Sequence, residues 1–472
     1  MTSGLWTDLS PSKRCQWVDL LRGLAVIVMI EVHAVNTWLR LDLRPEWLNY
    51  LNGLVAPSFL MCAGFSLVLS TFRTDGTLRP FWPETARRLG FILLCAYLLH
   101  APGLTLAEWT VLNTPQKLRE LFKIDVLQCV VYSLLLLQAL ARTLGTAKRF
   151  TWAALGLTLF IALVSPSLWI GGVGEGVWLP LRGLLNGNKD QASGVQALFP
   201  LFPWLAFVSF GSFLGGAYRH FRAEVVGEVG EPRSRWSEGR YLAALFGLGL
   251  ALMLWGMLRK HGWLWSGTWV QTPGGTWLLN GFTYAELSAI HNTTLPSIAE
   301  RLGWICMGGA ALGALDALRP KLPGPNPLEA AGRESLLLYM LHLNLIYGVL
   351  MTTFVVSRTG WEWNSLGWGL TGLLTAAIVG LNLWAGVWWQ GIRKDALRMR
   401  RLQRAGLAVL MVNFIAGGWL TFRFLMHSPE LAREPYGFLA TARARKGLPA
   451  TPDGLPASPE EAAREKARLA RK

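Results

Sequence analysis

The stretch VDLLRGLAVIVMIEVHAVNTWL, residues Val18–Leu39, decides the class of fold. It is long enough to cross the roughly 30 Å hydrocarbon core of a bilayer as one helix. It nevertheless contains four ionisable side chains, Asp19, Arg22, Glu31 and His33. Such a group near the bilayer centre costs roughly 2.5–3.5 kcal/mol on insertion scales, so it is usually kept for a function, with an internal salt bridge as the alternative. The stretch predicts a spanning helix that carries a functional site.

Helical geometry divides these polar residues between two faces. Arg22 and His33 are eleven positions apart, which places them about 20° from each other around the axis and about 16 Å apart along it. Asn36 follows His33 on this face, and Asp19 precedes Arg22, whereas Glu31 points the opposite way. This arrangement predicts a path along one face of the helix, from the basic group of Arg22 to the imidazole of His33 deeper in the bilayer. Glu31 is expected to make a polar contact with another helix.

Composition excludes a soluble protein. The chain has 472 residues, of which 52% are hydrophobic, and apolar runs of about 18–22 residues recur along it. Its formal charge of +16 lies in short loops between these runs, as topology requires, and so does not indicate nucleic-acid binding. The cysteines show no paired spacing, so we expect neither a disulfide framework nor a metal site. They are Cys15, Cys62, Cys95, Cys129 and Cys306.

The predicted fold is all-α, a polytopic transmembrane helix bundle of about 10–11 spans. Lys13 and Arg14 place the N-terminus in the cytoplasm, and we expect the bacterial inner membrane. The predicted domains are a cytoplasmic N-terminus (1–17), a transmembrane domain (18–424) and a largely disordered tail (425–472). The expected spans are 18–39, 50–72, 89–106, 124–140, 150–168, 197–218, 241–258, 302–318, 335–356, 366–389 and 406–424.

Two further features of the spans are predicted. Residues 169–196 and the segment after 258 are expected to be long external loops, the first with the alternative of a re-entrant cap. Gly211 and Gly215 are four residues apart, which permits close contact with a neighbouring helix.

Four phrases in the same order resemble the heparan-α-glucosaminide N-acetyltransferase-like membrane proteins. They are VDLLRGLA at 18–25, APSFL through AGFS at 56–66, FPLFPWLAFVSFGSFLGG at 199–216, and GRESL at 332–336 leading to Tyr339 and His342. The likeness runs from about residue 12 to 350. The spacing of Arg22 and His33 is also similar to the first-helix signature of the acyltransferase-3 membrane proteins.

The resemblance implies transfer of an acyl group, commonly acetyl, from cytoplasmic acyl-CoA to a sugar amine or hydroxyl across the membrane. Acetyl-CoA would be a co-substrate, with no permanently bound cofactor. The animal lysosomal members place their catalytic histidine in the loop after the first helix and have Asn at the position of His33. Here the loop at 40–49 has no histidine, so the role carries over only onto His33, by the acyltransferase-3 pattern.

We assign His33 as the general base, because a neutral imidazole can take a proton from the attacking acceptor, with a typical gain of 10²–10⁴-fold. An acetyl-histidine intermediate is the alternative. Arg22 is expected to bind a CoA phosphate and Asp19 to orient it, although Arg22 paired with Asp19 also fits a simple topological anchor. Asn36 is expected to hydrogen-bond His33 or the thioester carbonyl.

Three residues are weaker candidates for contact with the acceptor: His291, His342 and Tyr339. A hydrogen bond between helices is the structural alternative for His342, and solvation for His291. The expected partners are acyl-CoA, a carbohydrate or glycolipid acceptor and membrane lipid, with homo-oligomer formation left open. The alternative functions are a proton-coupled secondary transporter and a non-catalytic glycan-assembly membrane protein.

Overall fold

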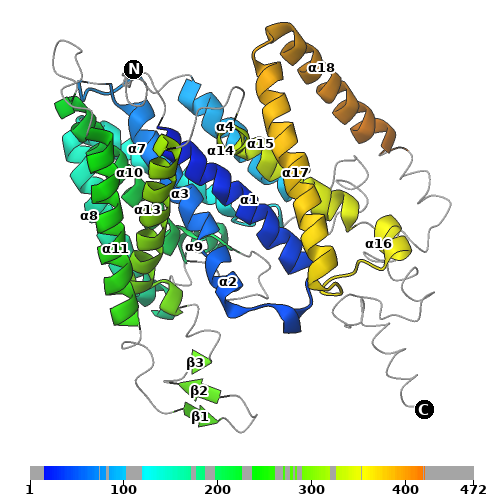
Figure 1. Cartoon of the computed structure of the whole chain (residues 1–472), viewed down its shortest axis with the longest axis horizontal. Coiled ribbons are helices and arrows are strands. Elements are labelled where there is room, and N and C mark those ends of the chain that lie inside the picture. The colour runs from blue at the N-terminus through cyan, green and yellow to red at the C-terminus, as the bar shows by residue number, and fades with distance from the viewer. Residues whose placement is uncertain are drawn as a thin grey trace. The chain divides into compact units, whose positions relative to one another are not determined.

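The computed structural model describes residues 15–73, 75–80, 84–101, 120–171, 177–186, 197–225, 237–260, 269–271, 277–279, 282–283, 290–318, 326–351, 353–417 and 419. Within these residues the chain is a bundle of α-helices (Figure 1), which confirms the predicted class. Six helices in this part are long and apolar enough to cross a membrane. They are Glu46–Thr71, which comprises two consecutive helices, and Val126–Leu144, Ala147–Ile170, Leu201–Phe221, Gly239–Arg259 and Trp368–Arg393.

Two further helices are long enough to cross but contain more charged residues. α1 (Gln16–Trp38) covers the stretch that decided the fold, and α13 (Leu295–Leu318) begins seven residues before the predicted span. The other labelled helices, with those of the six spans included, are α2 (Glu46–Asn52), α3 (Val55–Thr71), α4 (Glu84–Leu99), α7 (Val126–Leu144), α8 (Ala147–Gly171), α9 (Leu179–Asn186), α10 (Leu201–Val225), α11 (Ser237–Lys260), α14 (Pro327–Arg333), α15 (Ser335–Leu343), α16 (Thr353–Thr359) and α17 (Trp368–Arg393).

Glycines let the backbones of α3 and α10 touch. A Cβ atom on Gly211 would lie 2.0 Å from the carbonyl oxygen of Met61, and one on Gly215 would lie 2.7 Å from that of Phe65. Both distances are far below van der Waals contact, so a larger residue would force the helices apart. The predicted close packing at Gly211 and Gly215 is confirmed, and two of the resembling phrases, AGFS and SFGSFLGG, contact each other here.

The other two resembling phrases also meet, because α1 packs on α14. A Cβ on Gly332 would lie 1.9 Å from the carbonyl oxygen of Asp19, and one on Gly23 would lie 2.0 Å from that of Leu328. The glycines of the first-helix phrase and of GRESL are therefore two sides of one backbone contact. This contact fixes α14, and through it the start of α15, against α1.

The structure is more segmented than the sequence predicted in two places. The expected span at 335–356 divides into α15, a π-helix at Asn344–Leu350 and α16. The loop after α11 contains a small antiparallel sheet in the order β1 (Trp269–Gln271), β2 (Trp277–Leu279), β3 (Phe282–Thr283). Strands of two or three residues are too short to show the alternating pattern from which strands are predicted.

The chain divides into two compact units. The first comprises Met1–Leu99, Ile124–Gln191 and Val195–Lys394, and the second comprises His100–Lys123, Ala192–Gly194 and Asp395–Lys472. In the second unit, α18 (Ala396–Val412) is capped by the Asp395 carboxylate and continues into a π-helix at Asn413–Gly417. This helix begins ten residues before the predicted span at 406–424. The predicted tail and most of the predicted N-terminal segment lie outside the described residues.

Candidate active site

Helix α1 is surrounded by other helices of the first unit. It contacts α3, α13, α14, α15 and α17, and Figure 1 shows it between α3 and α17. Four of its polar side chains, those of Asp19, Arg22, His33 and Thr37, meet groups from neighbouring helical segments. These four side chains form two separate groups, one near the Gln16 end and one near the Trp38 end, with Val26 and Met29 buried between them.

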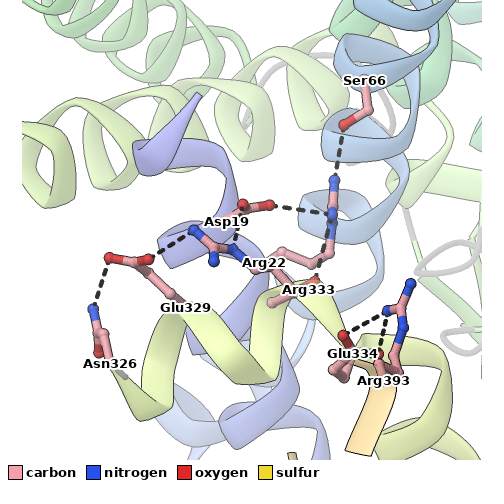
Figure 2. A network of polar contacts seen from close by, with 9 residues as sticks. Asp19, Arg22, Ser66, Asn326, Glu329, Arg333, Glu334 and Arg393 are labelled. Atoms are coloured by element: carbon pink, nitrogen blue, oxygen red, sulfur yellow. Dashed lines mark hydrogen bonds and ion pairs between the residues drawn. The ribbon is translucent and has the colours of Figure 1, made fainter. Parts of the chain in front are cut away.

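The group near the Gln16 end is an arginine network centred on Asp19 (Figure 2). The buried Asp19 carboxylate lies 3.3 Å from Nε of Arg333 and 3.6 Å from Nη1 of Arg22. Arg333 also donates to Glu329 at 2.9 Å. Because Arg333 ends α14, these ion pairs reinforce the glycine contact between α1 and α14.

The guanidinium of Arg22 donates hydrogen bonds to groups of the neighbouring helices. Nη2 donates to the Ser66 hydroxyl at 2.9 Å and to the Cys62 carbonyl at 3.4 Å, and Nη1 donates to the Gly332 carbonyl at 3.4 Å. Arg22 thus joins α1 to α3 and α14. Its contact with acyl-CoA stays a prediction, and so does the matching role of Asp19.

A further ion pair of the network lies closer to solvent. Arg393, at the end of α17, donates from Nη1 to both carboxylate oxygens of Glu334, at 2.7 and 2.9 Å. The side chain of Arg393 is 55% exposed and that of Arg333 is 34% exposed, whereas the carboxylates that hold them are largely buried. The accessible cations of the network are therefore Arg333 and Arg393.

The group near the Trp38 end is a histidine cluster, formed by His33, Thr37, Tyr339, His342 and Tyr347. Nδ1 of His33 lies 3.0 Å from the Tyr347 hydroxyl, and the ring centroids of His33 and His342 are 5.2 Å apart. Tyr339 packs edge-on against His342, with the ring centroids 5.7 Å apart. Tyr347 belongs to the π-helix that follows α15, and π-helical turns occur frequently at functional sites.

The protonation pattern of His342 follows from its surroundings. The side chain is fully buried, and Nδ1 lies 2.7 Å from the carbonyl oxygen of Leu338. A carbonyl oxygen only accepts, so Nδ1 carries the hydrogen, and in the neutral ring Nε2 presents a lone pair. Nε2 has no hydrogen-bond partner among the described residues. Full burial without a polar partner at Nε2 favours the neutral ring, so His342 presents an unprotonated nitrogen beside His33.

Asp125 adds a negative charge beside this cluster, and our sequence-based reasoning missed it. It caps the start of α7, where its carboxylate accepts from the Val126 amide at 2.7 Å while its own amide donates to the Gln128 side chain at 3.2 Å. The carboxylate is close enough to act electrostatically on His33 and Tyr339. In the sequence, Asp125 is recognisable only by the Gln three residues later, a pattern that indicates a helix cap. This pattern does not indicate a functional site.

The remaining sequence candidates lie elsewhere. The Asn36 side-chain oxygen accepts from Nη1 of Arg44 at 3.2 Å, so the structure pairs Asn36 with the following loop and not with His33. His291 lies before the start of α13. Glu31 meets Asn52 of α2: with the Asn52 amide oriented to satisfy both polar atoms, its nitrogen donates to Oε2 of Glu31 at 2.8 Å. The expected helix-to-helix contact of Glu31 is thereby confirmed.

Of the predicted site residues, the structure brings His33, His342 and Tyr339 together. It brings Asp19 and Arg22 together at the other end of α1. Residues 14–238 match the family model described as "Heparan-alpha-glucosaminide N-acetyltransferase, catalytic". This segment, just under half of the chain, is heparan-α-glucosaminide N-acetyltransferase-like, as the resembling phrases predicted. No match to a curated protein is found.

The match to a family of membrane N-acetyltransferases supports acetyl transfer as the class of activity. The matched segment contains Asp19, Arg22, His33 and Asp125. The α14–α15 region, with Arg333 and His342, lies beyond it. Each of the two polar groups on α1 is therefore completed by residues from outside the matched segment.

Proposed function

We propose that the chain transfers an acyl group, acetyl in the simplest case, from acyl-CoA on one side of the membrane to an amine or hydroxyl of a sugar on the other. The observation that carries the proposal is the histidine pair. His33 and His342, with ring centroids 5.2 Å apart, combine a buried unpartnered nitrogen with the nearby charge of Asp125. The family supports the reaction class.

The sidedness of the proposal follows from the positive-inside rule, which assigns the Gln16 end of α1 to the cytoplasm. The arginine network then faces the acyl-CoA side, and the histidine cluster faces the acceptor side. The accessible guanidiniums of Arg333 and Arg393 are suited to the anionic phosphates of CoA. Arg22 lies deeper and holds the helices that line the route. Arg22 and His33 are about 16 Å apart along the helix, a separation that the acyl-bearing arm of CoA would cross.

In the reaction, the acceptor nitrogen or oxygen attacks the thioester carbonyl, and the carbon–sulfur bond breaks. His33 takes the proton that the acceptor loses, while the neutral His342 ring packs against the His33 ring and holds it in position. The leaving thiolate finally receives the proton and departs as free CoA. The Asp125 carboxylate favours the transient imidazolium, and the Tyr347 hydroxyl orients the His33 ring through Nδ1.

The test is release of free CoA by the purified full-length protein in lipid nanodiscs, followed with a thiol probe. Acetyl-CoA is the donor, and methyl glucosaminide and methyl glucoside are the amine and hydroxyl acceptors. We expect acceptor-dependent release that falls about 100-fold or more in His33→Ala. The control is His220→Ala, which removes an exposed histidine at the end of α10.

Two results would contradict the proposal. One is the absence of CoA release with either acceptor, which would favour the transporter or glycan-assembly alternatives. The other is release by His33→Ala at the wild-type rate while its thermal midpoint matches that of His220→Ala.

A further inference from the structure

A stacked pair of aromatic rings lies beside His33. Tyr347 and Trp363 have ring centroids 6.0 Å apart and planes inclined by only 19°. The hydroxyl of Tyr347 is the group that lies 3.0 Å from Nδ1 of His33. Trp363 is 56% exposed and Tyr347 is 37% exposed. An accessible aromatic surface therefore begins one hydrogen bond from the proposed base.

The segment that carries Trp363 is fixed to the end of α1 by backbone hydrogen bonds. The Asn364 amide donates to the Thr37 carbonyl at 2.9 Å, and the Leu366 amide donates to the Trp38 carbonyl at 2.8 Å. The Arg40 amide donates in turn to the Leu366 carbonyl at 3.0 Å. Because α1 also carries His33, one rigid element sets the position of both the base and the aromatic pair.

Arg44 adds a side-chain bridge to the same segment. Its guanidinium donates to the side-chain oxygens of Asn36, at 3.2 Å, and of Asn364. Asn364 has a φ of 53°, and among the described residues it is the one non-glycine position with a positive φ. Asn tolerates this left-handed conformation better than most residues do, but it is held only where the surroundings impose it, as is common at ligand sites. The bridge thereby holds the residue that follows Trp363 in the chain.

We infer that Trp363 and Tyr347 form the subsite that binds the sugar ring of the acceptor, an inference that rests on the proposed transfer to a carbohydrate. The apolar C–H face of a pyranose matches the face of an indole ring, and its hydroxyls remain free for polar partners and solvent. A ring stacked on Trp363 lies beside His33, where its amine or hydroxyl is deprotonated. Asn36 and Arg44 are positioning residues for this subsite.

A second stacked pair supplies the comparison. Trp384 and Trp388 on α17 have centroids 5.9 Å apart at 14°, and both are exposed. They lie near the opposite end of α17, whose final residue is Arg393 of the arginine network. Exposed tryptophans near the end of a spanning helix are typical of the membrane-interface belt. Trp384 is therefore a matched control for loss of an exposed, stacked indole.

The experiment measures the KM for methyl glucosaminide and for acetyl-CoA in nanodiscs, for Trp363→Ala, Trp363→Leu, Trp363→Phe and Trp384→Ala. We expect the acceptor KM to rise about ten-fold in the Ala and Leu variants, to stay within about three-fold of wild type in the Phe variant, and to be unchanged in Trp384→Ala. The KM for acetyl-CoA is expected to be unchanged in all four. Because Leu retains apolar bulk without an aromatic face, it separates stacking from simple burial in lipid.

The inference is overturned if Trp363→Leu has the acceptor KM of wild type, or if the Ala and Leu variants raise both KM values equally. A belt residue would lower the yield of folded protein and leave the acceptor KM unchanged. If the wild type shows no transfer, the proposed function fails. Binding of methyl glucosaminide, measured by calorimetry, then tests the sugar subsite independently of activity. Binding that is lost in Trp363→Leu supports it, and binding that is absent or unaffected overturns it.

Discussion

Replacement of Gly332 by Ala probes the contact that joins the two halves of the site. The added Cβ would lie 1.9 Å from the Asp19 carbonyl oxygen, about 1.5 Å short of ordinary van der Waals contact. That atom belongs to the backbone and cannot rotate away, so α14 must withdraw from α1. Overpacking of this kind typically costs about 1–3 kcal/mol, and we expect the upper end. For a unit of roughly 350 residues, about 3 kcal/mol lowers the thermal midpoint by about 4 °C.

The same displacement reaches the histidine cluster. α14 ends at Arg333 and α15 follows at once, so a shift of α14 moves His342 relative to His33. Misplacement by about 1 Å can cost about 100-fold in rate, and we expect kcat to fall by about that factor. The matched control is Gly380→Ala on α17, where a Cβ meets nothing within 4 Å and greater helix propensity should raise stability by about 0.5–1 kcal/mol.

Differential scanning fluorimetry and the CoA-release assay measure both effects on the same preparations. If Gly332→Ala unfolds at the temperature of Gly380→Ala and transfers at the wild-type rate, α1 and α14 do not pack as described. The proposed link between this contact and the histidine cluster would then be wrong.

Arg22→Lys retains the charge but loses the planar fork that joins three helices, so we expect a lower thermal midpoint. The KM for acetyl-CoA tests the predicted contact of Arg22 with CoA: a raised KM would support the contact, and an unchanged KM would refute it. Tyr347→Phe removes the hydroxyl beside His33 and retains the stacked ring. We expect kcat to fall about ten-fold with no change in acceptor KM, whereas Tyr97→Phe, which removes a hydroxyl from a tyrosine pair elsewhere, should leave kcat unchanged. Glu31→Gln should change kcat by less than about two-fold because Glu31 faces α2, and a large loss would show that the carboxylate takes part in proton transfer.

The sequence predicted those features that depend on spacing along one helix. The eleven-residue separation placed Arg22 and His33 at different depths, and the opposite direction of Glu31 agrees with its contact to Asn52. The spacing of Gly211 and Gly215 predicted a close helix contact for the same reason. In each case the residues compared lie on one regular helix, so the 3.6-residue period determines which of them share a face.

Features that depend on distant segments were not predictable in this way. His33 and His342 are more than 300 residues apart, and no periodicity shows that α15 places them side by side. Asp125 was visible only as a helix cap, and the Asn364 turn gave no pattern at all. Asn36 shares a face with His33, but the loop after α1 brings Arg44 to it first, a contact that helical geometry alone cannot anticipate.

The most direct test of the histidine pair is the kcat of His33→Ala, His342→Ala and the double variant, compared with wild type at saturating acetyl-CoA and glucosaminide. Residues that act as one unit give non-additive losses. We predict that each single variant loses about 100-fold or more and that the double variant loses little beyond the worse single variant. A His342→Ala enzyme with wild-type kcat, or a double variant whose loss is the product of the two single losses, would contradict the account.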